Sequence, residues 1–271
     1  MKQRILYLLT MIFARPVFYG MARKLFHLSV RFMGLLNAEN FAISGEGVFL
    51  WRALTNRTKP VIFDVGANEG KYAREVMKRN PQARLYCFEP HPRTFSRLTE
   101  TAQKLGFQAL NLGCSEAPGE MPLYDYSAGD GHGSGSTHAS LSRDALAREG
   151  GQPVSETLVQ LVALDDFCRQ AGIDNIRLLK IDTEGFELQV LKGAQELVSR
   201  GAIDLIQFEF NEMNPYTRVF LRDFMDILPG YRLYRLLPKD LLPLSPYVPL
   251  EHELFAFQNI VAIRRDIRFP G

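Results

Sequence analysis

The residues best placed to do chemistry form a turn after a short apolar run. Residues 61–65 read Val-Ile-Phe-Asp-Val, and residues 66–70 read Gly-Ala-Asn-Glu-Gly, ahead of a helix-like run at 71–79. Apolar residues that lead to a carboxylate are typical of a buried parallel strand, and glycines let a ligand approach the backbone where a helix begins. Gly66 and Gly70 are spaced G-x-x-x-G, which is neither the dinucleotide G-x-G-x-x-G nor a Walker motif. The turn therefore predicts a nucleotide-like ligand other than the dinucleotides and nucleoside triphosphates that those two motifs bind.

Further acidic residues stand at the ends of other apolar runs. They are Glu89, which follows Asp64 by 25 positions, then Asp182 and Glu209. Ligands of open α/β sheets bind outside the carboxyl ends of the strands, so we expect these carboxylates to converge. Glu89 could accept both hydrogen bonds of a ribose diol, Asp64 could pair with an ammonium group, and the N–H groups of residues 66–70 could hold a carboxylate. A ligand with an amine, a carboxylate and a ribose is S-adenosylmethionine, which we expect as the cofactor.

Strand-like and helix-like segments alternate from residue 59 onward. Strands are expected at 61–65, 83–88, 107–112, 176–181 and 203–210, and helices at 71–79, 93–105, 164–170, 186–200 and 218–228. This alternation predicts an α/β fold with a doubly wound, mostly parallel sheet. Segments 231–236 and 259–264 are expected to form a final antiparallel pair. Residues 116–160 interrupt the pattern and are interpreted as an inserted loop or hairpin.

The N-terminal segment differs from the rest of the chain in charge. No acid precedes Glu39, whereas the segment carries the basic residues Lys2, Arg4, Arg15, Arg23, Lys24 and Arg31. Its apolar runs, 5–14 and 17–22, are separated by Arg15-Pro16 and fall short of the roughly 18 residues of a spanning helix. Residues 1–45 therefore read as a helical extension of a catalytic domain at 46–271. Residues 1–38 could contact an anionic membrane surface peripherally, or the helices could pack on the domain or on a second subunit.

The composition gives no support for a nucleic-acid partner and favours a reducing compartment. The 32 Lys and Arg against 30 Asp and Glu give a net charge of +2, so there is no global case for a nucleic-acid partner. Cys87, Cys114 and Cys168 lie far apart in apolar contexts, which favours buried thiols in a reducing compartment. We expect a cytoplasmic protein, at the inner membrane surface if the extension binds lipid, and leave a homo-oligomer open.

Further motifs follow the turn in order along the chain. They are Cys87-Phe-Glu-Pro90, Asn111-Leu-Gly-Cys-Ser115, Leu164-Asp-Asp166 and Leu179-Lys-Ile-Asp-Thr-Glu-Gly-Phe-Glu187. With residues 64–70, where Asn68 replaces the usual middle glycine, the set resembles the FkbM family of S-adenosylmethionine-dependent O-methyltransferases over residues 61–212. The resemblance implies a Rossmann-like class I methyltransferase domain, with a seven-stranded sheet whose last strand is antiparallel.

The resemblance also implies roles for matching residues. Glu89 would hold the ribose, Asn111 would border the adenine, and Asp182 would face the sulfonium and the substrate. Residues of the turn would line the methionine part of the cofactor. The predicted cofactor-binding residues are therefore Asp64, Gly66, Asn68, Gly70, Glu89, Asn111 and Asp182.

Methyl transfer to a hydroxyl needs a base beside that hydroxyl. The candidates are Asp182, Glu209 and His138, with His132 in the same Gly/Ser-rich segment, which could close over the acceptor as a lid. One alternative is Mg²⁺ assistance through Asp182, Glu209 and Asn211, although the favoured prediction contains no metal site. Another is a binding protein that keeps the cofactor fold without turnover.

The acceptor is the least determined part of the prediction. The resemblance implies hydroxyls of sugars, glycolipids or polyketides. The basic, apolar N-terminal segment favours a lipid-linked or envelope glycan among them. We therefore predict a saccharide or glycolipid acceptor.

Overall fold

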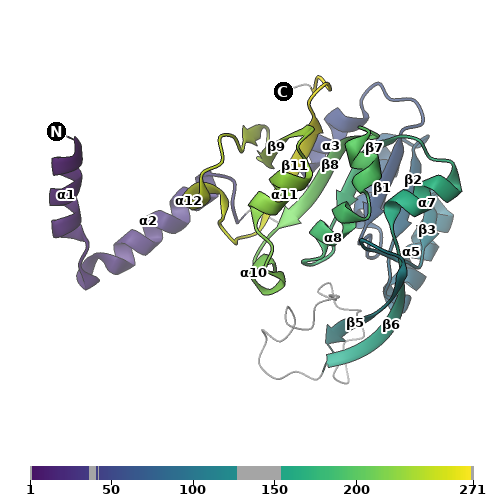
Figure 1. Ribbon diagram of the computed structural model, residues 1–271, viewed down its shortest axis with the longest axis horizontal. Helices are drawn as coiled ribbons and strands as arrows, with labels where there is room; N and C mark the ends of the chain where they lie inside the picture. Colours follow the sequence, from purple (N-terminus) through teal and green to yellow (C-terminus); the bar gives the residue numbers. More distant parts are fainter. Residues whose placement is uncertain (1, 37–40, 42, 127–153, 270–271) are drawn as a thin grey trace.

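A computed structural model describes residues 2–36, 41, 43–126 and 154–269 of the chain. Its centre is an eight-stranded sheet in the order β10-β9-β11-β8-β7-β1-β2-β3 (Figure 1). The strands are β1 (Val61–Val65), β2 (Arg84–Phe88), β3 (Gln108–Leu110), β7 (Ile176–Ile181), β8 (Ile203–Phe210), β9 (Tyr231–Leu236), β10 (Leu241–Pro243) and β11 (Gln258–Arg264).

The strand directions confirm the predicted topology. Strands β3, β2, β1, β7 and β8 are parallel to their neighbours, while β11 runs antiparallel to both β8 and β9. The count differs from the seven strands expected, because the short strand β10 pairs with β9 at the edge of the sheet. Chain order reverses between β1 and β7, and ligands of open α/β sheets bind at such a switch point.

Both faces of the sheet are buried, which explains its continuous apolar strands. Alternate residues of β1 point into different cores: Ile62 belongs to one buried cluster and Phe63 to the other. The first core includes residues of α3 (Glu46–Leu54), α4 (Lys71–Arg79) and α5 (Pro92–Leu105). The second includes residues of α7 (Leu164–Ala171), α8 (Glu187–Lys192), α9 (Gln195–Ser199) and α11 (Leu221–Ile227). The short helices α10 (Asn214–Thr217) and α12 (Pro249–His252) follow β8 and β10.

Two helical segments differ from the predictions. The helix expected over 186–200 divides into α8 and α9 around Gly193, where an added Cβ would lie 2.0 Å from the carbonyl oxygen of Ser115. The close approach of the Ser115 backbone therefore requires a glycine at this position between α8 and α9. Helix α3 was not predicted, although its buried residues, Phe49, Leu50, Ala53 and Leu54, have helical spacing.

The predicted insert begins and ends as a hairpin beside the main sheet. Strands β5 (Gly119–Tyr126) and β6 (Val154–Val162) pair antiparallel, and β6 also pairs with β4 (Gly113–Cys114). Figure 1 shows this hairpin reaching away from the carboxyl ends of the central strands. Residues 127–153 between its strands lie outside the described part of the chain, so the lid remains a prediction.

The N-terminal helices stand apart from the domain (Figure 1). They are α1 (Lys2–Phe13), a 3₁₀ turn (Pro16–Phe18) and α2 (Tyr19–Phe32). Among the described residues no single helix is long and apolar enough to cross a membrane, but segments 3–13 and 16–32, bent by 88°, meet those criteria as a pair. We call residues 2–32 the N-terminal arm.

Candidate active site

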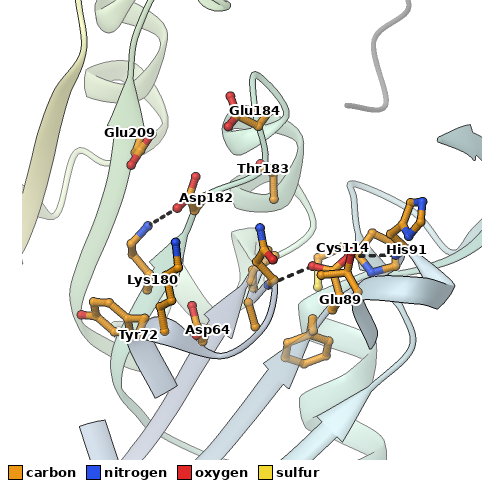
Figure 2. Close-up of a pocket in the computed structure, with 18 of the residues that line it drawn as sticks. Asp64, Tyr72, Glu89, His91, Cys114, Lys180, Asp182, Thr183, Glu184 and Glu209 are labelled. Atoms are coloured by element: carbon orange, nitrogen blue, oxygen red, sulfur yellow. Dashed lines mark hydrogen bonds and ion pairs between the residues drawn. The ribbon is translucent and has the colours of Figure 1, made fainter. Parts of the chain in front are cut away.

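A cavity of about 610 Å³ opens at the carboxyl ends of β1, β2, β7 and β8 (Figure 2). It gathers residues from segments far apart in sequence, as the strand-end carboxylates predicted. The polar and charged side chains that line it include Glu46, Asp64, Asn68, Lys71, Tyr72, Arg74, Glu75, Glu89, His91, Thr94, Lys180, Asp182, Thr183, Glu184 and Glu209.

The turn after β1 depends on the glycine at its start. Gly66 has φ of 79°, and an added Cβ would lie 1.7 Å from the carbonyl oxygen of Asp182. The amide of Asp182 in turn donates to the carbonyl of Val65 at 2.9 Å. Gly66 therefore lets β1 and β7 deliver their ends to one point, in a conformation that other residues rarely adopt.

The next residues of the turn have left-handed backbone conformations and lead into α4. Asn68 has φ of 49° and Gly70 has φ of 81°, so the backbone of both residues is in the left-handed region. Gly70 is the residue before α4, which places the positive end of that helix at the cavity. Asparagine tolerates the left-handed region better than most residues, which explains how Asn68 replaces a glycine.

Glu89 is held by the backbone on both sides of its carboxylate. Its Oε2 accepts from the Asn68 amide at 2.9 Å and its Oε1 from the His91 amide at 2.8 Å, as Figure 2 shows. Burial raises the pKa of Glu89 to about 7, although the two amide hydrogen bonds oppose the rise. The carboxylate is thus fixed in place, with lone pairs left to accept hydrogen bonds from a diol.

Asp64 is buried under the same turn, and one of its carboxylate oxygens has no hydrogen-bond partner. Only 1% of its surface is exposed, and its Oδ2 makes no hydrogen bond. Burial raises its pKa to about 7, while the ammonium of Lys180 opposes that rise. A buried acceptor without a donor is costly, so this oxygen suits a ligand that brings a cation or a hydrogen-bond donor.

These features fit S-adenosylmethionine. Glu89 presents acceptors suited to its ribose, the helix end at Gly70 suits its carboxylate, and the unpartnered Oδ2 of Asp64 suits its ammonium. Gly66 leaves room for the Asp182 backbone, which brings the end of β7 to the same cavity.

The opposite side of the cavity is built around a buried lysine. The Nζ of Lys180 lies 3.0 Å from Oδ2 of Asp182 and 5.8 Å from the centre of the Tyr72 ring. Burial alone would lower the pKa of Lys180, but the carboxylates of Asp182, Glu209, Glu46 and Asp64 outweigh burial and raise it. Lys180 therefore stays charged, whereas the Asp182 side chain is 37% exposed toward the cavity.

Two further carboxyl groups lie beside Asp182 (Figure 2). Burial, and then the charge of Asp182, raises the pKa of Glu209 well above its usual value. The same causes raise the pKa of Glu184 to about 8. The raised pKa values favour the protonated form of both groups, which can donate a hydrogen bond, more than in an ordinary exposed glutamate.

Glu187 serves the loop rather than the cavity. Its Oε1 accepts from the amides of Thr183 at 2.9 Å and Gly185 at 3.2 Å. It therefore fixes the backbone that carries Asp182 and Glu184 ahead of α8.

Two predicted cofactor contacts need correction. Gly70 does not line the cavity: its amide donates to the carbonyl of Ala67 at 2.8 Å, and an added Cβ would lie 3.1 Å from Leu98. Asn111 does not line the cavity; its side-chain amide donates to the carbonyl oxygens of Glu89 and Pro90, each at 2.9 Å. Asn111 therefore braces the loop after β2, and its neighbours Leu112 and Cys114 line the cavity instead. The sequence placed the loop correctly but could not tell which of its side chains turn inward.

Other site residues were missed because they come from unexpected places. Glu46 begins α3, and its Oε1 accepts from Nε2 of Gln207 at 2.8 Å. Tyr72 donates to Oε1 of Gln207 at 3.1 Å. These contacts connect α3, α4 and β8, and no spacing in the sequence marks them.

The remaining predicted residues fall into two groups. His132 and His138 lie outside the described residues, so their roles as bases remain predictions. Asn211, considered for Mg²⁺, uses its Oδ1 to accept from the Met213 amide at 2.9 Å. Within residues 2–36, 41, 43–126 and 154–269, no group of three or more His, Cys, Asp or Glu side chains is arranged to hold a metal ion.

Comparison with known proteins decides what this arrangement represents. The family described as the methyltransferase FkbM domain matches residues 64–236, more than half of the chain. The chain belongs to the FkbM methyltransferase family. The cofactor of this FkbM enzyme is S-adenosylmethionine, and its chemistry is methyl transfer.

Curated relatives agree with this assignment. The 2-O-methyltransferase NoeI of Sinorhizobium fredii is 32% identical over 197 residues, covering 69% of this chain and 78% of NoeI. The hexuronic acid methyltransferase AglP of Haloferax volcanii is 30% identical, covering 49% of each chain. The 31-O-demethyl-FK506 methyltransferase FkbM of Streptomyces tacrolimicus is 29% identical, covering 56% of this chain and 70% of the relative.

Proposed function

We propose that this FkbM methyltransferase methylates a hydroxyl group of a saccharide. The observation that carries the proposal is the Asp182 carboxylate, which is 37% exposed and held 3.0 Å from Lys180. It opens into the cavity that Glu89 and residues 66–68 also line. Two relatives support the acceptor class by name, one a 2-O-methyltransferase and one a hexuronic acid methyltransferase.

The cofactor would be held by the side of the cavity next to β1 and β2. Asp64 would face its ammonium, Glu89 its ribose, and the N-terminal end of α4 its carboxylate. When bound, S-adenosylmethionine supplies an electrophilic methyl group on a sulfonium.

The side next to β7 and β8 would handle the acceptor. Asp182 has one oxygen bonded to Lys180 and would accept the hydroxyl proton at the other, Oδ1, as the oxygen attacks. The hydrogen bond from Lys180 fixes the direction of that carboxylate. Glu209 and Glu184, whose pKa values are raised, would donate hydrogen bonds to other oxygens of a sugar.

Transfer of labelled methyl groups to a panel of acceptors tests this function. The purified chain, incubated with methyl-labelled S-adenosylmethionine, should label saccharides or glycolipids but not their analogues with the hydroxyls blocked. Labelling of amines or of nucleic acid in place of saccharides would contradict the proposal.

The same assay separates the proposal from the Mg²⁺-assisted alternative. In this structure Asp182 already pairs with an ammonium group, which occupies one of its oxygens. We therefore expect the rate to be the same with EDTA and with added Mg²⁺. A rate that is lost with EDTA and restored by Mg²⁺ would favour the metal-assisted route.

A further inference from the structure

The N-terminal arm exposes apolar and basic side chains together. Its basic residues are Lys2, Arg4, Arg15, Arg23, Lys24 and Arg31, with no acid among residues 1–38. Its large apolar side chains are nevertheless open to solvent, including Leu6 at 65%, Leu8 at 59% and Leu25 at 56% exposed. An apolar surface of this kind marks a binding site, and its uniform positive charge selects an anionic partner.

Helix α2 separates its two kinds of residue by face. Met21, Leu25, Leu28 and Phe32 are spaced i, i+4, i+7 and i+11, which places them along one side of a helix. Arg23, His27 and Arg31, at intervals of four, lie along another side, and Lys24 is next to Arg31 on the helix surface. This division is that of a helix lying in a membrane interface, with its basic side toward lipid phosphates.

Helix α1 is better suited to lie in the same plane than to cross the bilayer. Its apolar run from Ile5 to Phe13 spans about 14 Å at about 1.5 Å per residue, roughly half of a hydrocarbon core of about 30 Å. Crossing would carry Lys2 and Arg4 into that core, where charges are costly. The rings of Phe13 and Phe18 pack at 5.2 Å across the bend between the helices, so the arm forms an angular, two-helix surface.

The base of the arm is bonded to the rim of the cavity. The carbonyl of Met33 accepts from the buried guanidinium of Arg235 at 3.1 Å. The amide of Leu36 donates to the carbonyl of Phe257 at 2.8 Å, and Phe257 lines the cavity. A surface that binds the arm therefore lies close to the acceptor side of the enzyme.

We propose that the N-terminal arm is an interfacial anchor that seats this enzyme on an anionic phospholipid bilayer and brings its cavity to saccharides carried by membrane lipids. The proposal of a membrane anchor does not depend on which acceptor the enzyme methylates. The choice of a lipid-borne acceptor rests on the saccharide O-methylation proposed above.

Sedimentation with vesicles tests the anchor, using the full chain. We expect binding to vesicles that contain phosphatidylglycerol and not to phosphatidylcholine vesicles, with binding that weakens as salt is raised. The triple variant R23E/K24E/R31E should bind anionic vesicles at least about tenfold more weakly, and L25Q/L28Q should also lose binding. The control K78E/K104E/R200E makes the same charge change on exposed residues outside the arm and should bind as the wild type does.

Other roles for the arm, as a spanning segment or as a contact with a second copy of the chain, would give different results. Equal binding of R23E/K24E/R31E and the control, or no binding to anionic vesicles, would overturn the anchor. Retention in the pellet after an alkaline carbonate wash would show a spanning segment instead. Dimers that L25Q/L28Q converts to monomers, without vesicle binding, would show that a second copy covers the arm.

Activity measurements test the choice of acceptor. With a glycolipid in anionic vesicles, R23E/K24E/R31E should lose at least about tenfold in rate, whereas its rate with a water-soluble saccharide should match that of the wild type. Equal loss with both acceptors, or no loss with either, would overturn the link between arm and acceptor. Failure of the wild type to methylate any saccharide would instead refute the proposed function, and vesicle binding would still decide the anchor.

Discussion

The cavity has two sides that hold their polar groups by different means. Next to β1 and β2, Glu89 is fixed by two backbone amides and Gly66 by its left-handed conformation, so the main chain does most of the positioning. Next to β7 and β8, Asp182 is fixed by the side chain of Lys180, with the raised-pKa groups of Glu184 and Glu209 around it. Figure 2 shows Glu89 on the right of the view and Lys180, Asp182 and Glu209 on the left.

This difference suggests a division of labour. A main-chain cradle suits a ligand that does not vary, because few side-chain substitutions can alter it. A cluster of titratable side chains suits proton transfer and an acceptor that differs between relatives, such as those named for a hexuronic acid and for demethyl-FK506. We therefore expect substitutions on the first side to change cofactor binding and those on the second to change turnover.

The largest effect is expected from Gly66→Ala. The new Cβ would lie 1.7 Å from the carbonyl of Asp182, in a backbone with φ of 79°. We expect a loss of unfolding free energy above about 3 kcal/mol and no measurable binding of S-adenosylmethionine. Thermal unfolding and calorimetric titration measure the two quantities.

Gly106→Ala is the matched control for that change. Gly106 has φ of 80°, but nothing lies within 4 Å of its added Cβ. It should cost only about 1 kcal/mol of stability and leave cofactor affinity intact. If the two alanine variants behaved alike, the contact between β1 and β7 would not be what Gly66 provides.

Next in size is the effect of Asp182→Asn on turnover. The amide cannot accept the hydroxyl proton, so kcat should fall by about 100-fold or more. Cofactor affinity should change little, because the cradle is on the other side. Asp166→Asn, which alters an exposed ion pair with Arg169, is the control and should retain the wild-type rate. A near-normal kcat for Asp182→Asn would remove it as the base.

Glu89→Gln should act on cofactor binding rather than on the chemical step. Both carboxylate oxygens accept backbone hydrogen bonds, so the amide of glutamine must face one of those donors. A mismatch of this kind costs about 1–3 kcal/mol, which predicts a roughly 5- to 150-fold weaker affinity for S-adenosylmethionine. Unchanged affinity in calorimetry would contradict the ribose assignment.

The smallest effect is a pH dependence on the cofactor side. Burial raises the pKa values of Asp64 and Glu89 to about 7, from ordinary values of 3.8 and 4.5. The folded apoprotein therefore keeps protons that the unfolded chain releases, so its stability falls as pH rises from about 4 to 7. A cationic ligand favours the ionised carboxylates, and its affinity should weaken about tenfold from pH 7 to pH 6.

Calorimetry in buffers of different ionisation enthalpy measures that linkage. Binding at pH 6 should release protons, and Asp64→Asn should reduce the number released. Proton uptake on binding would show that these carboxyl groups do not respond to the ligand's charge.

The sequence predicted the strand-end carboxylates of both sides but not every residue of the cavity. Asp64, the 66–70 turn and Glu89 follow local rules, because each stands at the end of an apolar strand or the start of a helix. Asp182 and Glu209 were found by the same rule. The glutamate that begins α3 was not, because Gly45 precedes it without a capping side chain and only tertiary contacts bring Glu46 to Gln207.

Other differences have similar physical causes. Asn111 was predicted to face the adenine, but rotamer choice turned its amide to two backbone carbonyls. Strand β10 has three residues, too few for an alternating pattern to be visible in the sequence. Gly193 divides a helix because of a contact with Ser115, which no spacing along the chain reveals.

The most direct test of the two-sided cavity compares Glu89→Gln and Asp182→Asn in paired measurements. For each variant, the dissociation constant of S-adenosylmethionine is measured by calorimetry, and the single-turnover rate with a saccharide acceptor is measured at saturating cofactor. We predict that Glu89→Gln weakens affinity while its saturated rate stays within a few-fold of wild type, and that Asp182→Asn binds normally but loses about 100-fold or more in rate. Loss of the same quantity in both variants would contradict the division between a cofactor side and an acceptor side.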